Sequence, residues 1–115
     1  MKQLTKAEFI ANVTDYTTGA EETPFRGKRP AVVEFFATWC PHCQAMKPVL
    51  ERVEAQYDGK VDFYQIDIDK QPEITDDFDI EGTPTIFYYP VKGRPIRKMG
   101  EMPAEQIAEL IDIIL

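Results

Sequence analysis

The apolar residues between positions 31 and 68 follow a strand, helix, strand pattern. Ala31 to Ala37 is a short apolar run rich in β-branched and aromatic residues, and it predicts a central strand covered on both faces. Cys43 to Tyr57 repeats apolar residues at helical intervals and predicts a helix, with a kink where Pro48 removes one backbone hydrogen bond. Val61 to Ile68 predicts a second strand, parallel to the first if the helix is a crossover.

The flanking segments complete an α/β fold. Leu4 to Val13 begins with a capping box, Thr5 with Glu8, followed by apolar residues at helical spacing, and predicts a short amphipathic helix. A short helix is predicted at Pro72 to Phe78. A strand pair follows, at Thr85 to Tyr89 and Ile96 to Met99, and a closing helix is predicted at Pro103 to Ile114. This order predicts a three-layer α/β/α sandwich around a central mixed β-sheet.

Length and charge limit the classes of protein to consider. The 115 residues make a single domain, residues 1–115, in which the turn-rich stretch Asp15 to Pro30 is predicted as a surface loop. A net charge of −7, with no basic stripe, argues against nucleic acid as a partner.

The N-terminal residues indicate the cellular compartment in which the protein is expected. They lack the apolar region of a signal peptide, and no apolar run approaches the length of a membrane span. We therefore expect a cytoplasmic protein without a membrane partner. We also expect a monomer. A trimmed form of an exported protein would look the same, so a periplasmic location stays open.

Cys40-Pro41-His42-Cys43 holds both cysteines and the only histidine. A Cys-x-x-Cys at the start of a helix, near a strand–helix–strand pattern, is typical of a redox motif. With Cys40 at the N-cap and Pro41 at the first helical position, the Cys40 sulfur faces unpaired backbone N–H groups and the positive end of the helix dipole, which stabilise a thiolate. We therefore expect Cys40 to be the nucleophile, and Cys43, one turn further in and less exposed, to be the resolving thiol.

Two further side chains each have a functional and a plain interpretation. His42, when protonated, would stabilise the Cys40 thiolate and make the disulfide a stronger oxidant. The plain alternative is an exposed histidine without a role. Glu34 interrupts the apolar strand, where burial would raise its pKa and let it take the proton from Cys43. Its plain alternative is a carboxylate that points to solvent at a strand end.

Thr83-Pro84 stands directly before a predicted strand. Base rates favour an ordinary trans bond, because only about 5–6% of X–Pro bonds in folded proteins are cis.

Taken together, the motifs resemble those of the thioredoxin family. The resemblance covers nearly everything after Pro30, and its segments are Val33 to Cys43, Pro48, Ile66 to Asp69, Gly82 to Thr85, and Gly100. It implies a thioredoxin fold in which Pro84 is cis and faces the active-site cysteines.

The resemblance also implies a docking surface for an extended protein substrate. Trp39, Pro41, Thr83 and Pro84 would line that surface, and Gly82, Gly100 and Glu101 would flank it. Trp39 has a plain alternative as a core aromatic residue.

The chain departs from the family pattern at several positions. Pro-His stands between the cysteines where Gly-Pro is usual, a dipeptide that resembles bacterial periplasmic disulfide oxidases in that feature alone. Glu34 replaces the usual Asp, and Gln65 replaces the lysine that often accompanies that acid. Phe36 replaces the usual Trp, and the stretch at 15–30 is longer than the family norm. Without the lysine's charge, the pKa of Glu34 should lie higher.

These observations predict an enzyme, a thiol–disulfide oxidoreductase. It would exchange electrons with protein disulfides or dithiols through a reversible Cys40–Cys43 disulfide, without a cofactor or metal, and with a reductase or an oxidase as redox partner. The Pro-His motif favours an oxidising couple, whereas the missing export signal favours a reducing compartment. The direction of electron transfer between the protein and its substrates therefore stays open.

Two alternatives come from other classes. One is a non-enzymatic interaction module that holds a partner in the same groove. The other is metal binding through Cys40, His42 and Cys43, which would need further ligands from a dimer or an external thiol.

Overall fold

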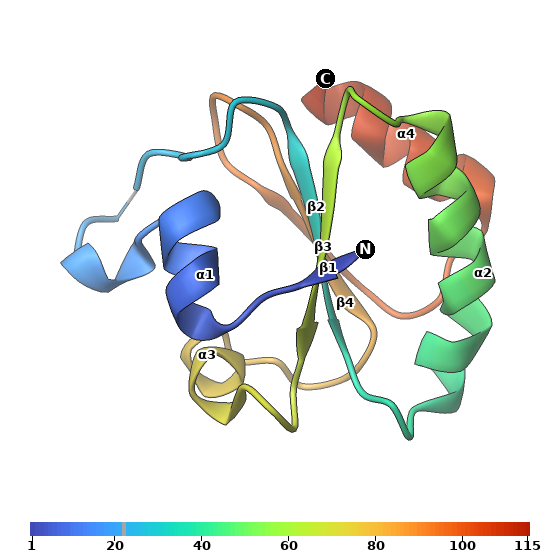
Figure 1. Ribbon diagram of the computed structural model, residues 1–115, viewed down its shortest axis with the longest axis horizontal. Helices are drawn as coiled ribbons and strands as arrows, with labels where there is room; N and C mark the ends of the chain where they lie inside the picture. Colours follow the sequence, from blue (N-terminus) through green and yellow to red (C-terminus); the bar gives the residue numbers. More distant parts are fainter. Residues whose placement is uncertain (22) are drawn as a thin grey trace.

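The computed structural model describes residues 1–21 and 23–115, and its strands form one five-stranded mixed sheet (Figure 1). The strands are β1 (Lys2–Gln3), β2 (Ala31–Phe36), β3 (Asp62–Asp67), β4 (Thr85–Tyr89) and β5 (Ile96–Met99), in the spatial order β1-β3-β2-β4-β5. β3 is parallel to both β1 and β2, whereas β4 is antiparallel to β2 and β5 to β4. The predicted parallel crossover and the predicted hairpin are therefore both confirmed.

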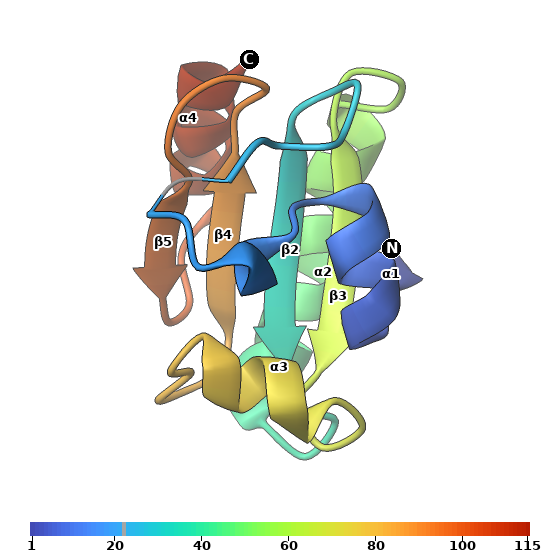
Figure 2. The ribbon, with the colours of Figure 1, turned by 90° about the vertical axis from the view of Figure 1, so that its left-hand side faces the viewer.

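Two helices cover each face of the sheet, which makes the predicted three layers (Figures 1 and 2). Helices α1 (Lys6–Asn12) and α3 (Pro72–Asp77) lie on one face, and α2 (Pro41–Gln56) and α4 (Ala104–Ile114) lie on the other. The helix α2 continues through Pro48, and the kink expected there stays a prediction. Within the described residues, no helix has the length and apolar character that crossing a membrane requires.

The capping box at the start of α1 is present as predicted. The Glu8 N–H donates to the Thr5 hydroxyl oxygen at 3.1 Å, and the Thr5 N–H donates to Glu8 Oε1 at 3.0 Å. These bonds satisfy two backbone donors that the first turn of a helix leaves unpaired. The sequence does not predict β1, because two exposed residues carry no periodic signal.

The described residues of the stretch at 15–30, which are 15–21 and 23–30, lie on the α1 side of the sheet, and Tyr16 and Phe25 pack against the apolar cluster there. The stretch contains a short 3-10 helix, Tyr16–Thr18, and Phe25 makes an isolated antiparallel bridge with Thr14. The Phe25 ring stacks on that of Tyr89, with centroids 5.9 Å apart. Position 22 of the predicted surface loop lies outside the described residues.

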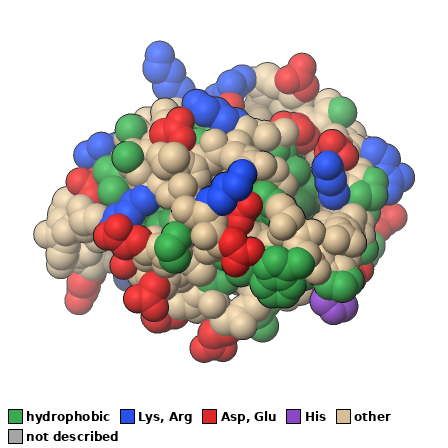
Figure 3. All heavy atoms as spheres, turned by 60° about the horizontal axis from the view of Figure 1, so that its bottom comes forward, with side chains coloured by type: hydrophobic (Ala, Val, Ile, Leu, Met, Phe, Trp, Pro, Cys, Tyr) green, Lys and Arg blue, Asp and Glu red, His purple; other side chains and the backbone are tan. Residues whose placement is uncertain are grey.

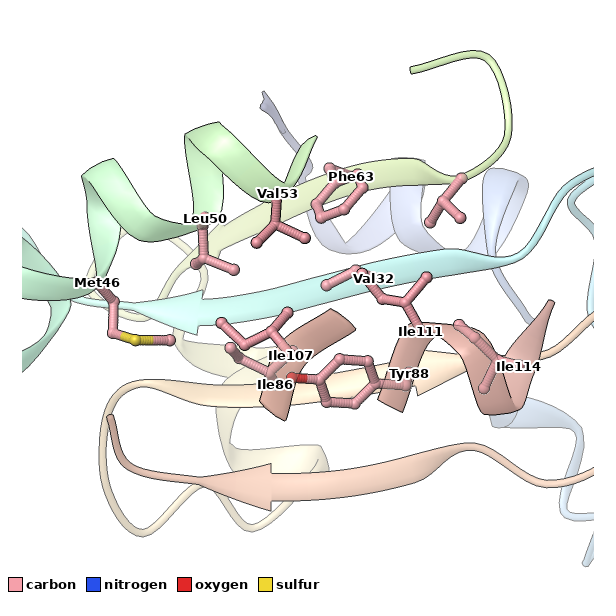
Figure 4. Close-up of a cluster of buried hydrophobic side chains, with 11 residues drawn as sticks. Val32, Met46, Leu50, Val53, Phe63, Ile86, Tyr88, Ile107, Ile111 and Ile114 are labelled. Atoms are coloured by element: carbon pink, nitrogen blue, oxygen red, sulfur yellow. The ribbon is translucent and has the colours of Figure 1, made fainter. Parts of the chain in front are cut away.

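The core has one apolar cluster on each side of the sheet. The cluster under α2 and α4 is mostly aliphatic (Figure 4), and its buried members are Val32, Met46, Leu50, Val53, Val61, Phe63, Ile86, Tyr88, Ile107, Ile111 and Ile114. The cluster under α1 and α3 is richer in aromatic rings, with Phe9, Phe35, Phe87 and Tyr89 buried. Each large apolar side chain buried in this way contributes about 1.5–3 kcal/mol. Both faces of β2 are thus covered, as its apolar sequence predicts.

Candidate active site

The Cys-x-x-Cys motif starts α2 at the end of β2. Cys40 is the N-cap, in extended conformation, and Pro41 is the first helical residue, as predicted. The Cys43 N–H donates to Sγ of Cys40 at 3.4 Å, so the sulfur occupies the place of an N-cap acceptor. Three-residue spacing on the first helical turn thus brings the two cysteines together.

Both cysteines are free thiols, and both are buried. They form a small apolar cluster with Ala37, against which Phe36 and Ile68 pack. Cys40 is 4% exposed and Cys43 is 6% exposed, so the two residues are buried to nearly the same extent, and the lower exposure expected for Cys43 stays a prediction. The difference between the two lies in hydrogen bonding and local packing.

The pKa values of the two thiols move in opposite directions. Burial would raise the pKa of Cys40, but hydrogen bonds with the Thr83 side chain, the Cys43 thiol and the backbone N–H groups of Cys43 and His42 outweigh it and hold the pKa below its ordinary value. Burial raises the pKa of Cys43, and its hydrogen bond with Cys40 raises it further. Cys40 is therefore the thiol that ionises first.

The turn that contains Thr83 and Pro84 meets the motif at Cys40, through Thr83. The peptide bond between them is cis, as the family resemblance implies and against the base rate. The thiol of Cys40 lies 3.4 Å from the carbonyl oxygen of Thr83. The carbonyl oxygen of Pro84 accepts the Gly100 N–H at 2.8 Å, which ties the end of β5 to this turn.

Trp39 lies on the surface beside the motif. Its side chain is 65% exposed, so the alternative of a core aromatic residue is wrong. The indole Nε1–H donates to Oδ2 of Asp69 at 2.7 Å, which holds the ring in place. Figure 3 looks at the end of the molecule where β2 leads into α2, and hydrophobic side chains gather there beside the only histidine.

Glu34 is buried, with 2% of its surface exposed, so the alternative of a solvent-facing carboxylate is wrong. Because side chains alternate along a strand, it shares the α2 side of the sheet with Val32. Gln65, opposite it on β3, donates to Oε1 at 2.9 Å. Burial raises the pKa of Glu34 to about 7, although the bond from Gln65 lowers it in part.

His42 projects from the first turn of α2 into solvent, with a side chain that is 69% exposed. Its Nδ1 lies 2.5 Å from Oε1 of Glu101, in the loop between β5 and α4. The hydrogen bond and the charge of Glu101 raise the pKa of His42. Sequence reasoning did not pair these residues, because they are 59 positions apart; the only signal was the resemblance that put Glu101 beside the docking surface.

Metal binding has little support at this site. In the part of the chain that the structure describes, no group of three or more histidine, cysteine or acidic side chains could hold a metal ion.

A pair of close thiols with opposed pKa shifts, at a helix N-terminus and beside a cis-proline turn, defines a thiol–disulfide oxidoreductase. The thioredoxin family model matches residues 1–113. The chain belongs to the thioredoxin family and has the thioredoxin fold.

Individual relatives agree with this assignment. A thioredoxin from Borreliella burgdorferi is 34% identical over 108 residues, which is 94% of this chain and 92% of the relative. A thioredoxin from Staphylococcus haemolyticus is 38% identical over 82 residues, 70% of this chain and 78% of the relative. A crystal structure of chloroplastic thioredoxin z superposes with a TM-score of 0.81 at 28% identity and covers 99% of this chain and 93% of that chain.

Proposed function

We propose that this protein reduces disulfide bonds in other proteins, with Cys40 as nucleophile and Cys43 as resolving thiol. The Cys40 thiolate attacks one sulfur of the substrate disulfide, and the other substrate sulfur leaves as a thiolate. The Cys43 thiolate then attacks Sγ of Cys40, and the second substrate sulfur leaves. The substrate has gained two electrons, and the protein holds the Cys40–Cys43 disulfide.

The observation that carries this proposal is the asymmetry of the two thiols. The sulfur of Cys40 accepts the Cys43 N–H at the N-cap, and the pKa of Cys40 is lowered while that of Cys43 is raised. A thiolate is the attacking species in disulfide exchange, so the first attack falls to Cys40.

Cys43 must lose its proton before it can resolve the mixed disulfide, and we assign the acceptor role to Glu34. Its Oε2 is buried and has no hydrogen-bond partner among the described residues. A carboxyl with a pKa of about 7 is ionised in part at neutral pH and can take up a proton there.

Trp39, Pro41, Thr83 and Pro84 form the proposed docking surface. An extended substrate segment would pair with the backbone of Thr83, whose carbonyl oxygen already lies beside Cys40. Trp39, directly before Cys40 in the chain, offers an exposed ring.

Relatives named thioredoxin are in line with a role as a reductant, which a reductase would return to the dithiol form. A reducing compartment such as the cytoplasm would keep the couple in that form. The potential of the Cys40/Cys43 couple tests the direction. A value near about −270 mV supports a reductant, and one near about −120 mV would contradict it in favour of an oxidase.

Mixed-disulfide trapping tests the roles of the cysteines. Insulin reduction by dithiothreitol should be accelerated by the wild type and not by Cys40→Ser. Cys43→Ser should accumulate a mixed disulfide between Cys40 and the substrate, because the resolving thiol is missing. Turnover by Cys40→Ser would overturn the assignment, and stable binding of a partner without turnover would favour an interaction module.

A further inference from the structure

The side chains of His42 and Glu101 join two elements at the mouth of the site. His42 belongs to the first turn of α2, and Glu101 to the loop between β5 and α4. We propose that Glu101 is a positioning residue that acts on Cys40 through His42, by holding the imidazolium against this loop and so setting the pH at which the redox couple responds to His42. This inference rests on the proposed role of Cys40 as nucleophile.

Two backbone contacts hold the loop that carries Glu101. On one side, Gly100 donates its N–H to the carbonyl oxygen of Pro84 at 2.8 Å. Gly100 has a φ of +98°, in the region that favours glycine, so this turn requires a residue without a Cβ atom. On the other side, the Met102 N–H points to Sδ of Met46 at 3.5 Å, one turn along α2 from His42.

Glu101 therefore stands between an anchor on the cis-proline turn and an anchor on α2. Because the backbone on both sides of Glu101 is already held, formation of the pair has to order only the two side chains. Preorganisation of this kind reduces the entropy that usually weakens an exposed ion pair.

The charged groups that face His42 are Glu101 from the loop and Cys40 from the N-cap of its own helix. Both raise the pKa of His42, with Glu101 the larger influence. His42 therefore keeps its proton to a higher pH than an ordinary histidine, whose pKa is about 6.5. Because a Cys40 thiolate and an imidazolium stabilise each other, the loss of this proton changes the stability of the thiolate.

The test follows His42 and the redox couple over the same pH range. His42 is the only histidine in the chain, so its NMR titration needs no assignment among several signals. Glu101→Gln removes the charge and retains the backbone on both sides. Glu105→Gln, on the exposed surface of the first turn of α4, is the matched control because it removes one charge from the same region.

In Glu101→Gln we expect the His42 titration to shift to lower pH, and the inflection in the potential-against-pH curve to shift with it. Glu105→Gln should leave both in place. The shift should shrink in 1 M salt, where the screening length falls to about 3 Å. When His42→Gly is present as well, Glu101→Gln should no longer move the inflection.

Two results would overturn the inference, and they are separable. An unchanged His42 titration in Glu101→Gln would show that the pair does not set the protonation of His42. A shifted titration with an unchanged potential curve would show that the pair does not act on Cys40. Trapping of a mixed disulfide by Cys43→Ser reports on the nucleophile independently, so failure of the inference differs from failure of the proposed function.

Discussion

Gln65 donates a hydrogen bond to Oε1 of Glu34 across the β2–β3 pair, while Oε2 of the same carboxyl is buried without a partner among the described residues. A neutral amide stabilises one oxygen but supplies no charge, so burial dominates and raises the pKa of Glu34 to about 7. The buried acid therefore changes its protonation near physiological pH.

Glu34 should make the protein less stable as the pH rises. The folded protein keeps this proton up to about pH 7, whereas an ordinary glutamate loses it near 4.5. Between these values the folded state binds more protons than the unfolded chain, so the free energy of unfolding falls with increasing pH, by about 3 kcal/mol across the window.

Glu34→Gln removes this contribution. The free energy of unfolding is measured with urea at pH 4.5 and pH 8. Between these pH values it should fall by about 3 kcal/mol less in the variant than in the wild type. The difference across pH is the readout, because the amide also changes the local hydrogen bonding. Equal losses in both proteins would show that Glu34 titrates normally.

Removing the proposed proton acceptor should slow the second half of the reaction. In Glu34→Ala, release of substrate from the mixed disulfide with Cys40 should slow by roughly 100-fold near neutral pH, the lower end of general-base effects. Rapid-mixing kinetics across pH measures this rate, with the exposed Glu109→Ala as control. A rate that matches wild type at every pH would remove Glu34 from the mechanism.

Replacing His42 by glycine should make the couple more reducing. The variant loses the positive charge that stabilises the Cys40 thiolate, so the pKa of Cys40 should rise and the potential should become more negative. Thiolate absorbance against pH and equilibration with glutathione measure the two quantities. If neither changes, His42 has no part in tuning the couple.

The helix α4 stabilises the domain through one face. Ile107 is fully buried in the cluster beneath α2 and α4, so Ile107→Ala should cost about 2–5 kcal/mol of unfolding free energy. Ile113 lies on the same helix and is 68% exposed, so Ile113→Ala should change stability by no more than about 0.5 kcal/mol. Urea denaturation of both variants tests the comparison, and similar losses would contradict the packing of this helix.

Elements with a strong periodic signal could be predicted from the sequence. The apolar run of β2 and the helical stripe of α2 lie within a residue or two of their predicted bounds, because burial on the sheet requires those patterns. The N-cap position of Cys40 followed from Pro41, whose fixed φ suits the first helical residue.

The remaining features depend on contacts between distant segments. The His42–Glu101 pair joins residues from two elements, and no local pattern marks it. Similar exposure of Cys40 and Cys43 follows from packing around Ala37 rather than from their order along the helix. The cis bond before Pro84 was expected only through the family resemblance, since local sequence favours trans.

The short strand β1 has a consequence for association between molecules. It covers the outer edge of β3 at Tyr64 and Gln65, and the Leu4 N–H donates to the Gln65 carbonyl oxygen at 2.8 Å. An uncovered strand edge is a template for another chain. Loss of the first three residues would therefore open a self-association site on β3, at the residue that also holds the buried acid.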